Sequence, residues 1–347
     1  MDYSICAYSL PHIMGYLKTK GGASCDKPLT PVELMDWAVS RSLKGIEIPL
    51  QSIVPTFDGA KVETGWKGDF RAETEQRNLR LIADYGAILD HNWEHLRDYI
   101  TLAAANGVKI VRVILSHILC GDRREFLPQT FLEARKPHIE RLKLALDHAA
   151  SLGLCIAVEN HQDVTCDELL MIWEQVGNHP AYGIVMDTGN PLAVGEDPVS
   201  FTQRAAHLIR HLHLKDYTIH FAPNGYRLVR CAAGDGCIDF PAILKIVAQN
   251  GHDVMPAIET AAQATRTIPI LEETWWQTFD LVHANRLPLA LQTLWKHGIA
   301  ADVPYPSAWE REAETDEVCR EEWDLVERSV TYFRNYDNAL APASTTE

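Results

Sequence analysis

Residues 154–163 read LCIAVENHQD, and this stretch shows a pattern that recurs along the chain. A short apolar run at 154–158 ends in a charged residue, Glu159, and a loop follows it. An amphipathic stretch over His138–Leu152, just before the run, is predicted to be a helix. Strands that alternate with helices are typical of parallel βαβ units. The stretch therefore predicts an α/β protein with polar residues at the carboxyl ends of its strands.

The same rhythm can be followed through most of the chain. The predicted strands are Tyr3–Tyr8, Gly45–Ile48, Arg80–Ile88, Lys109–Leu115, Leu154–Val158, Gly183–Met186, Ile209–Leu214 and Asp253–Ile258. A helix is predicted over Pro31–Ser42, because Thr30 can cap it and a proline opens it. About eight strands in roughly 260 residues indicate a (β/α)8 TIM barrel, whereas a doubly wound sheet, the alternative, would use fewer strands.

The rhythm changes after about residue 265. We expect a catalytic barrel over residues 1–265, a mostly helical C-terminal extension over 266–340 and a disordered tail over 341–347. The extension contains an acidic helical stretch, predicted over Trp309–Tyr336.

The composition excludes several classes of protein. Hydrophobic residues make up 46% of the 347, which is enough for a full core and too many for a disordered chain. The formal net charge of −15 argues against a nucleic-acid partner, because an acidic surface repels phosphates. No apolar run approaches the 18 residues of a membrane span, so no membrane partner is expected.

The cysteines and the N-terminus bear on the compartment. Eight cysteines include no CxxC pair, which excludes zinc-ribbon and thioredoxin-like motifs. The N-terminal stretch MDYSICAYSLPH lacks the features of a signal peptide. We therefore expect a reduced, cytoplasmic protein. No P-loop or dinucleotide fingerprint is found, so no nucleotide cofactor is expected.

Four segments place polar residues just after apolar runs, and these carry the candidate chemistry. They are VENHQD with Glu159, VMDTGNP with Asp187, HLHLKD with His213 and AIET with Glu259. Successive segments are separated by about one βαβ unit of roughly 30 residues, the last by a longer loop. The four residues therefore belong to consecutive barrel strands, whose tips can converge.

Three carboxylates directed at one point repel each other unless a cation lies among them. Glu159, Asp187, His213 and Glu259 are therefore the predicted metal ligands. A set of three carboxylates and one imidazole favours Mn²⁺, with Mg²⁺, Co²⁺, Fe²⁺ or Zn²⁺ as alternatives. Read singly, each acid could instead cap a helix or pair with an arginine.

Other polar residues near the strand ends are candidates for the substrate site. His161, two residues after Glu159, is a candidate base for proton transfer, or it braces Glu159. Lys215 and Asp216 are predicted to bind substrate oxygens or stabilise an oxyanion, the alternative being a buried ion pair. His117 is predicted to line the pocket and Arg230 to bind a phosphate or an acidic group, with packing or solvent exposure as alternatives.

These segments resemble the xylose-isomerase-like sugar phosphate isomerase/epimerase superfamily of metal-dependent TIM barrels, over roughly residues 1–262. The resemblance implies that Glu159, Asp187, His213 and Glu259 hold the metal and that the two glutamates also move the proton. It extends more weakly to Glu47 in GIEI. Asn190 stands where the ketose 3-epimerases have a substrate-binding histidine, so it is a candidate substrate contact and a departure from that group. Their arginine six residues after the histidine ligand is replaced by Ile219.

The predicted reaction is isomerisation or epimerisation of a keto-sugar or related polyol through a metal-stabilised enediolate. The alternative is a lyase or dehydratase that performs β-elimination on a 3-keto-glycoside or keto-cyclitol. The Glu159–His161 pair resembles the large subunit of C-glycoside deglycosidases, which implies a possible small partner subunit. A homo-oligomer acting on a small-molecule sugar is expected.

Two further classes of function are less well supported by the sequence. An abasic-site DNA endonuclease shares the barrel but needs more histidine ligands and a basic groove. A barrel that serves only as an interaction module would not need a four-ligand set.

Overall fold

The computed structural model describes residues 1–50, 53–55, 61–63, 68–127, 131–261, 263–279 and 286–340. The side chains of residues 53–55, 61–63 and 131–132 are outside this description. The tail predicted to be disordered, residues 341–347, also lies outside the described residues. No helix in the described part of the chain is long and apolar enough to cross a membrane.

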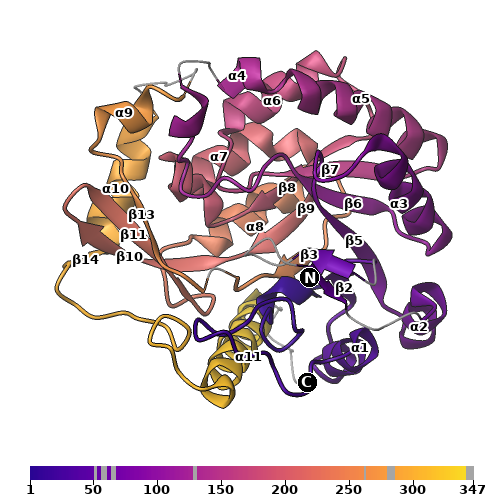
Figure 1. Cartoon of the computed structure of the whole chain (residues 1–347), viewed down its shortest axis with the longest axis horizontal. Helices are drawn as coiled ribbons and strands as arrows, with labels where there is room; N and C mark the ends of the chain where they lie inside the picture. Colours follow the sequence, from indigo (N-terminus) through magenta and orange to yellow (C-terminus); the bar gives the residue numbers. More distant parts are fainter. Residues whose placement is uncertain are drawn as a thin grey trace, which may run out of the picture.

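Eight parallel strands close into a barrel in the order β1-β12-β9-β8-β7-β6-β5-β2 (Figure 1). They are β1 (Ser4–Cys6), β2 (Gly45–Ile48), β5 (Arg80–Ala87), β6 (Ile110–Ile114), β7 (Cys155–Glu159), β8 (Tyr182–Asp187), β9 (Ile209–Leu214) and β12 (Pro256–Ile258). Each of the eight predicted runs overlaps one of these strands, with ends that differ by up to three residues. The TIM barrel is confirmed, and closure of the sheet excludes the doubly wound alternative.

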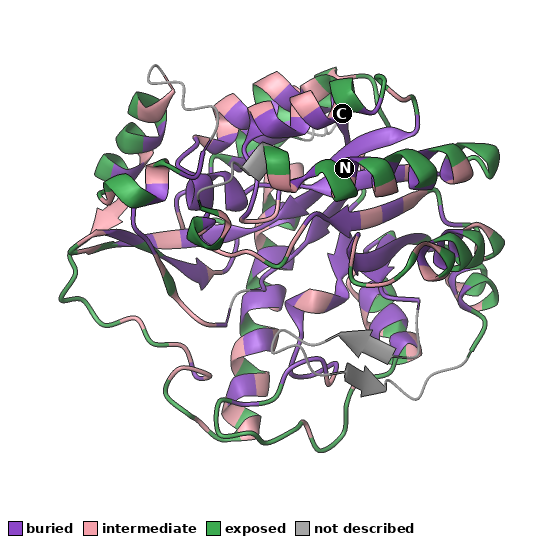
Figure 2. Cartoon of the chain, turned by 45° about the horizontal axis from the view of Figure 1, so that its top comes forward, coloured by how far each residue is buried: buried purple, intermediate pink, exposed green. Residues whose placement is uncertain are grey.

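Helices cover the outside of the barrel, one after each strand. In the described residues they are α1 (Pro31–Ser40), α2 (Phe70–Arg77), α3 (Trp93–Ala105), α5 (Lys136–Ser151), α6 (Cys166–Gln175), α7 (Pro198–Ala205), α8 (Phe240–Gln249) and α11 (Thr315–Leu340). Local sequence explains where they begin: Thr30 and Glu33 form a capping box at α1, and Thr165 and Glu168 form one at α6. The barrel strands are mostly buried, while the helices around them expose their outer faces (Figure 2).

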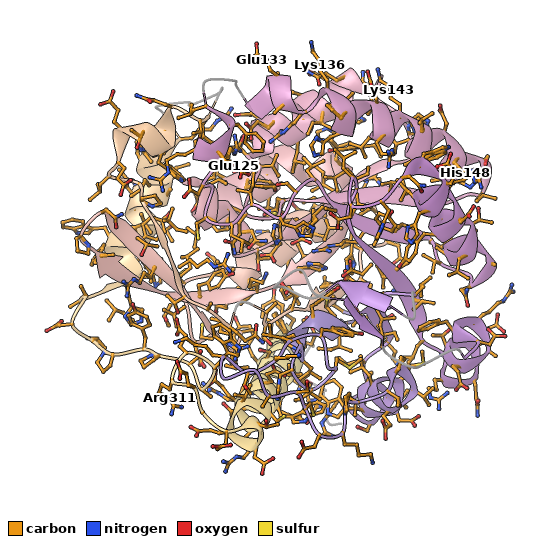
Figure 3. The ribbon with its side chains drawn as sticks, viewed as in Figure 1. Glu125, Glu133, Lys136, Lys143, His148 and Arg311 are labelled. Carbon is orange, nitrogen blue, oxygen red and sulfur yellow. The ribbon has the colours of Figure 1, made fainter. Side chains whose placement is uncertain are left out.

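Charged side chains gather on these outer faces. Glu133 on α4 (Phe131–Ala134) and Lys136 and Lys143 on α5 are exposed and point away from the barrel (Figure 3). Charged residues of soluble proteins are mostly exposed, and most of this chain's acidic residues belong to such a solvated surface.

Helix α11 takes the eighth position around the barrel, between α8 and α1 (Figure 1). Trp323 of α11 packs on Trp37 of α1, with ring centroids 5.2 Å apart, and Phe333 packs on Phe240 of α8 at 5.1 Å. The helix predicted as part of a C-terminal extension therefore completes the barrel's own ring. The predicted domain boundary at residue 265 falls between β12 and α11, the helix that follows β12 in the ring around the barrel.

Between β12 and α11 the chain leaves the barrel and contributes to a second sheet. This sheet has the order β13 (Arg266–Ile268), β11 (Gly225–Cys231), β10 (Asp216–Ala222), β14 (Gly298–Ile299). The β10–β11 hairpin was not predicted, because its strands follow the barrel strand β9 almost without interruption. The remaining elements are β3 (Ile53–Pro55), β4 (Lys61–Glu63), α9 (Glu273–Trp276), α10 (Leu287–His297), and the 3₁₀ turns η1 (Ala7–Ser9), η2 (Arg124–Phe126), η3 (Asn190–Val194) and η4 (Ala206–Leu208).

Candidate active site and metal centre

The four predicted metal ligands lie at the carboxyl ends of four neighbouring barrel strands. Glu159 and Asp187 are the last residues of β7 and β8, His213 is in β9, and Glu259 follows β12 directly. Asp187 is paired with His213 in the strand register, so their side chains start at the same level of the barrel. All four side chains are buried, as expected for residues that point into the barrel.

Three of these residues form a compact group that fits a divalent cation. One ligand atom from each of Glu159, Asp187 and His213 lies within 4.8 Å of the others. One Asp187 oxygen, Oδ1, accepts the backbone N–H groups of Gly189 and Asn190 at 2.8 and 3.0 Å, which leaves Oδ2 directed elsewhere. Two carboxylates and an imidazole, all buried, are a donor set that suits a divalent ion.

The fourth predicted ligand, Glu259, is linked to this group through the side chain of Lys215. The Lys215 ammonium lies 2.7 Å from Asp187 Oδ2 and forms a second ion pair with Glu259 Oε2. Burial raises the pKa of Glu259 to about 7, and Asp187 adds to this rise while Lys215 opposes it. Lys215 therefore stands between the two carboxylates and partly neutralises them.

Glu47 and Glu159 lie on opposite sides of the His213 ring. Nε2 is 2.7 Å from Glu47 Oε2, and Nδ1 is 3.7 Å from Glu159 Oε2. Burial disfavours the charged ring, but the two carboxylates outweigh it and raise the pKa of His213. Nε2 is taken up by the contact with Glu47, whereas Nδ1 has no hydrogen-bond partner among the described residues. Nδ1 is therefore the nitrogen that is available to a cation.

A second buried network, which the sequence analysis missed, holds Glu159. Arg112 Nε donates to Glu159 Oε2 at 2.5 Å, and Arg112 Nη1 donates to Asp84 Oδ1 at 2.8 Å. The other oxygen of Glu159 accepts from Asn190 Nδ2 at 3.3 Å. A charged residue inside each of the apolar runs KIVRVIL and LIADYGA was the signal that could have found Arg112 and Asp84.

The structure places two more predicted residues close to this group. Asn190, the first residue of η3, contacts Glu159 as described. His161 lies beyond the end of β7, and burial lowers its pKa to about 4, with Glu159 opposing the shift. Its Nδ1 atom has no hydrogen-bond partner among the described residues.

Three other predicted substrate residues are engaged elsewhere. Asp216 accepts backbone N–H groups from Tyr217, Gly234, Gly236, Cys237 and Ile238, so it ties β10 to the loop before α8. Arg230 pairs with Glu321 of α11 at 2.8 Å. His117 is exposed and lies 2.9 Å from Asp90. Asp216 and Arg230 thus have structural partners, and neither is brought to the four-residue group.

The fold and the grouped residues agree with a comparison against known families. A model of the xylose isomerase-like TIM barrel matches residues 36–300. The chain belongs to this family. The resemblance of the four strand-end segments to this superfamily is therefore confirmed.

Two curated relatives of this xylose isomerase-like protein illustrate the chemistry of similar chains. A 3-oxo-isoapionate decarboxylase of Pectobacterium atrosepticum is 23% identical over 188 residues, covering 52% of this chain and 64% of the relative. An inosose dehydratase of Clostridium botulinum is 29% identical over 136 residues, covering 35% and 45%. The matches thus span less than two thirds of either relative.

A similar solved structure is a xylose isomerase-like TIM barrel protein of Mycobacterium smegmatis in complex with magnesium. It aligns with a TM-score of 0.54 and 16% identity, over 84% of this chain and 97% of that chain. At this identity the likeness shows the fold.

Proposed function

We propose that the chain catalyses divalent-metal-dependent proton abstraction next to the carbonyl of a keto-sugar or keto-cyclitol. The observation that carries this proposal is the grouping of Glu159, Asp187 and His213 within 4.8 Å at the carboxyl end of the barrel. TIM-barrel enzymes place their active sites at this end.

The proposed ion is Mn²⁺, which Glu159, Asp187 and His213 would hold. Glu259, which pairs with Lys215, would be the fourth ligand. A bound divalent ion polarises carbonyl and hydroxyl oxygens and so acidifies the neighbouring C–H. Oxygen-rich donor sets with one imidazole favour Mn²⁺ or Mg²⁺ over softer ions.

The protein's own groups then move the proton and hold the substrate. Glu259 is the proposed base, because it is buried and its raised pKa suits proton transfer near neutral pH. Lys215 is proposed to donate a hydrogen bond to the oxygen that becomes negatively charged. Arg112 holds Glu159 in place, and Asn190 orients its other oxygen.

Removal of the proton next to the carbonyl gives an enediolate, which can go on to isomerisation or epimerisation, or to β-elimination. The residues of the site favour one of these two outcomes. Isomerisation or epimerisation, the first expectation from the sequence, requires only that the proton returns to carbon. β-Elimination also requires a group that protonates the leaving oxygen, and the Lys215 ammonium is a proton donor additional to the two glutamates. The curated relatives named above are a decarboxylase and a dehydratase. We therefore favour a lyase acting on a keto-cyclitol or 3-keto-glycoside.

Incubation in D₂O with Mn²⁺ and a panel of inososes, 3-keto-glycosides and ketohexoses separates the outcomes. Loss of water or of an aglycone supports the lyase, whereas deuterium in a re-formed or isomeric sugar supports the isomerase or epimerase. Absence of both in the presence of Mn²⁺, Mg²⁺, Co²⁺, Fe²⁺ and Zn²⁺ contradicts the proposal. The Glu259→Gln variant serves as the inactive control.

Three expectations about the cellular context stay predictions from the sequence. They are a homo-oligomeric state, a small partner subunit and a cytoplasmic location.

A further inference from the structure

Glu47 reaches across the barrel interior to a strand that is not its neighbour. It lies on β2, whereas its partners lie on β9, and β1 and β12 separate these two strands in the barrel order. Its carboxylate is fully buried. A buried carboxylate is costly unless it is paired, so Glu47 needs partners inside the barrel.

Both histidines of the HLHLKD segment meet this carboxylate. His211 Nε2 and His213 Nε2 each lie 2.7 Å from the same oxygen, Glu47 Oε2. The two rings are nearly perpendicular, at 88°, with centroids 5.3 Å apart. The other oxygen, Oε1, has no hydrogen-bond partner among the described residues. Glu47 Oε2 thus accepts hydrogen bonds from both imidazoles. Of the two histidines, only His213 belongs to the group with Glu159 and Asp187 that fits a cation.

We infer that Glu47 is a positioning residue that keeps the proton of His213 on Nε2, so that a bare Nδ1 faces the cation site. This inference rests on the metal site of the proposed function. A histidine that ligates a metal through one nitrogen generally donates its other N–H to a carboxylate or carbonyl, which fixes the tautomer and the ring orientation. His211 helps to hold the Glu47 oxygen without being a ligand itself.

The same region offers a competing arrangement, which the geometry disfavours. Cys6, Glu47 and His213 also place ligand atoms within 4.8 Å of one another. An ion held there would take Nε2 of His213, which already lies at hydrogen-bond distance from Glu47. With Nδ1 serving the first site, both nitrogens of one ring would have to ligate metals. The structure therefore assigns the Glu47 contact to a hydrogen bond.

Changes to the Glu47 carboxylate should lower the metal affinity in a graded way. Glu47→Met keeps the length of the side chain but removes the acceptor, and mutation of such a supporting group typically weakens metal binding by about 10- to 100-fold. Glu47→Gln keeps an acceptor oxygen and loses the charge, so we expect about the lower end of that range. Glu322→Gln is the matched control, because Glu322 is an equally buried carboxylate held by the backbone of His12 and Ile13.

Calorimetric titration of the metal-free chains with Mn²⁺ tests this directly. We expect one ion per wild-type chain, a weaker Kd in both Glu47 variants and an unchanged Kd in Glu322→Gln. A Kd equal to that of wild type in the Glu47 variants overturns the inference, as do two ions per wild-type chain. If Glu47→Met does not fold, the Kd of Glu47→Gln decides alone.

A spectroscopic measurement addresses the tautomer itself. In the Zn²⁺-loaded, ¹⁵N-histidine-labelled protein, NMR should find the remaining proton of His213 on Nε2. A proton on Nδ1 would contradict the assignment. A wild-type chain that binds no divalent ion at all refutes the proposed function, whereas equal binding by wild type and variants refutes only the role of Glu47.

Discussion

The Lys215 ammonium lies 2.7 Å from Asp187 Oδ2, inside the group of carboxylates that the barrel gathers at its carboxyl end. A protein cation and a bound metal ion compete for the same negative charge at this position. Lys215 must therefore contribute something other than metal binding.

Replacing Lys215 by methionine tests that contribution. We expect kcat to fall by roughly 100- to 10,000-fold, the range associated with the loss of a proton-transferring group. The Kd for Mn²⁺ should stay the same or become tighter, because a competing cation is removed. Steady-state kinetics and calorimetry measure the two effects, with the exposed Lys296→Met as control. Near-normal kcat in Lys215→Met would exclude its proposed role.

The two glutamates should be needed for turnover in different ways. Glu259→Gln removes the proposed base, and we expect a loss of at least about 100-fold in kcat, while Glu159, Asp187 and His213 should still bind Mn²⁺. Glu159→Gln leaves Arg112 opposite a neutral amide and weakens a ligand, so both kcat and Mn²⁺ affinity should fall. Kinetics and metal titration of both variants check this, with the surface variant Glu133→Gln as control. Full activity in either site variant would be incompatible with the proposed chemistry.

Stability should depend strongly on one of two adjacent arginines. Arg123 forms two 2.7 Å hydrogen bonds with Glu168, and both side chains are fully buried. Arg124, the next residue, pairs with Asp122 at the surface, with 39% of its side chain exposed. Arg123→Met leaves the buried Glu168 carboxylate with Arg135, 3.7 Å away, as its remaining cation. The variant should therefore destabilise the fold by up to about 3–5 kcal/mol. Arg124→Met should cost at most about 1 kcal/mol.

Urea denaturation of both arginine variants provides the measurement. Equal free energies of unfolding for Arg123→Met and Arg124→Met would show that the buried pair contributes no more than the exposed one.

The buried carboxyl of Glu322 on α11 should make stability depend on pH. Burial raises its pKa from the ordinary 4.5 to about 7, although Arg230 and the backbone of His12 oppose the shift. Between these two values the folded state binds more protons than the unfolded state, so its contribution to stability falls as pH rises. Relative to Glu322→Gln, wild type should lose up to about 3 kcal/mol between pH 5 and pH 8.

Denaturation curves of wild type and Glu322→Gln at pH 5 and pH 8 measure this difference. A difference between the two proteins that stays constant with pH would contradict the expected titration. An increase in the relative stability of wild type towards pH 8 would show that the sign is wrong.

The sequence alone determined the barrel and the principal candidate ligands, because both are local signals. Apolar runs, capping residues and turns repeat along the chain. Each of the four runs that precede a candidate ligand ends close to that residue, at the carboxyl end of the barrel. Gly45–Ile48 and Ile209–Leu214 were predicted with their observed ends. Glu159, Asp187 and His213 could be grouped because neighbouring parallel strands end at one side of a barrel.

Only the tertiary structure decided which groups hold those ligands. Glu47 and His213 are 166 positions apart, and Arg112 lies 47 positions from Glu159. Their contacts depend on strand register and on which side chains cross the barrel interior, which no local pattern contains. The position of α11 as the eighth barrel helix has the same cause. Its contacts with α1 and α8 form only when the chain returns to the barrel after the second sheet.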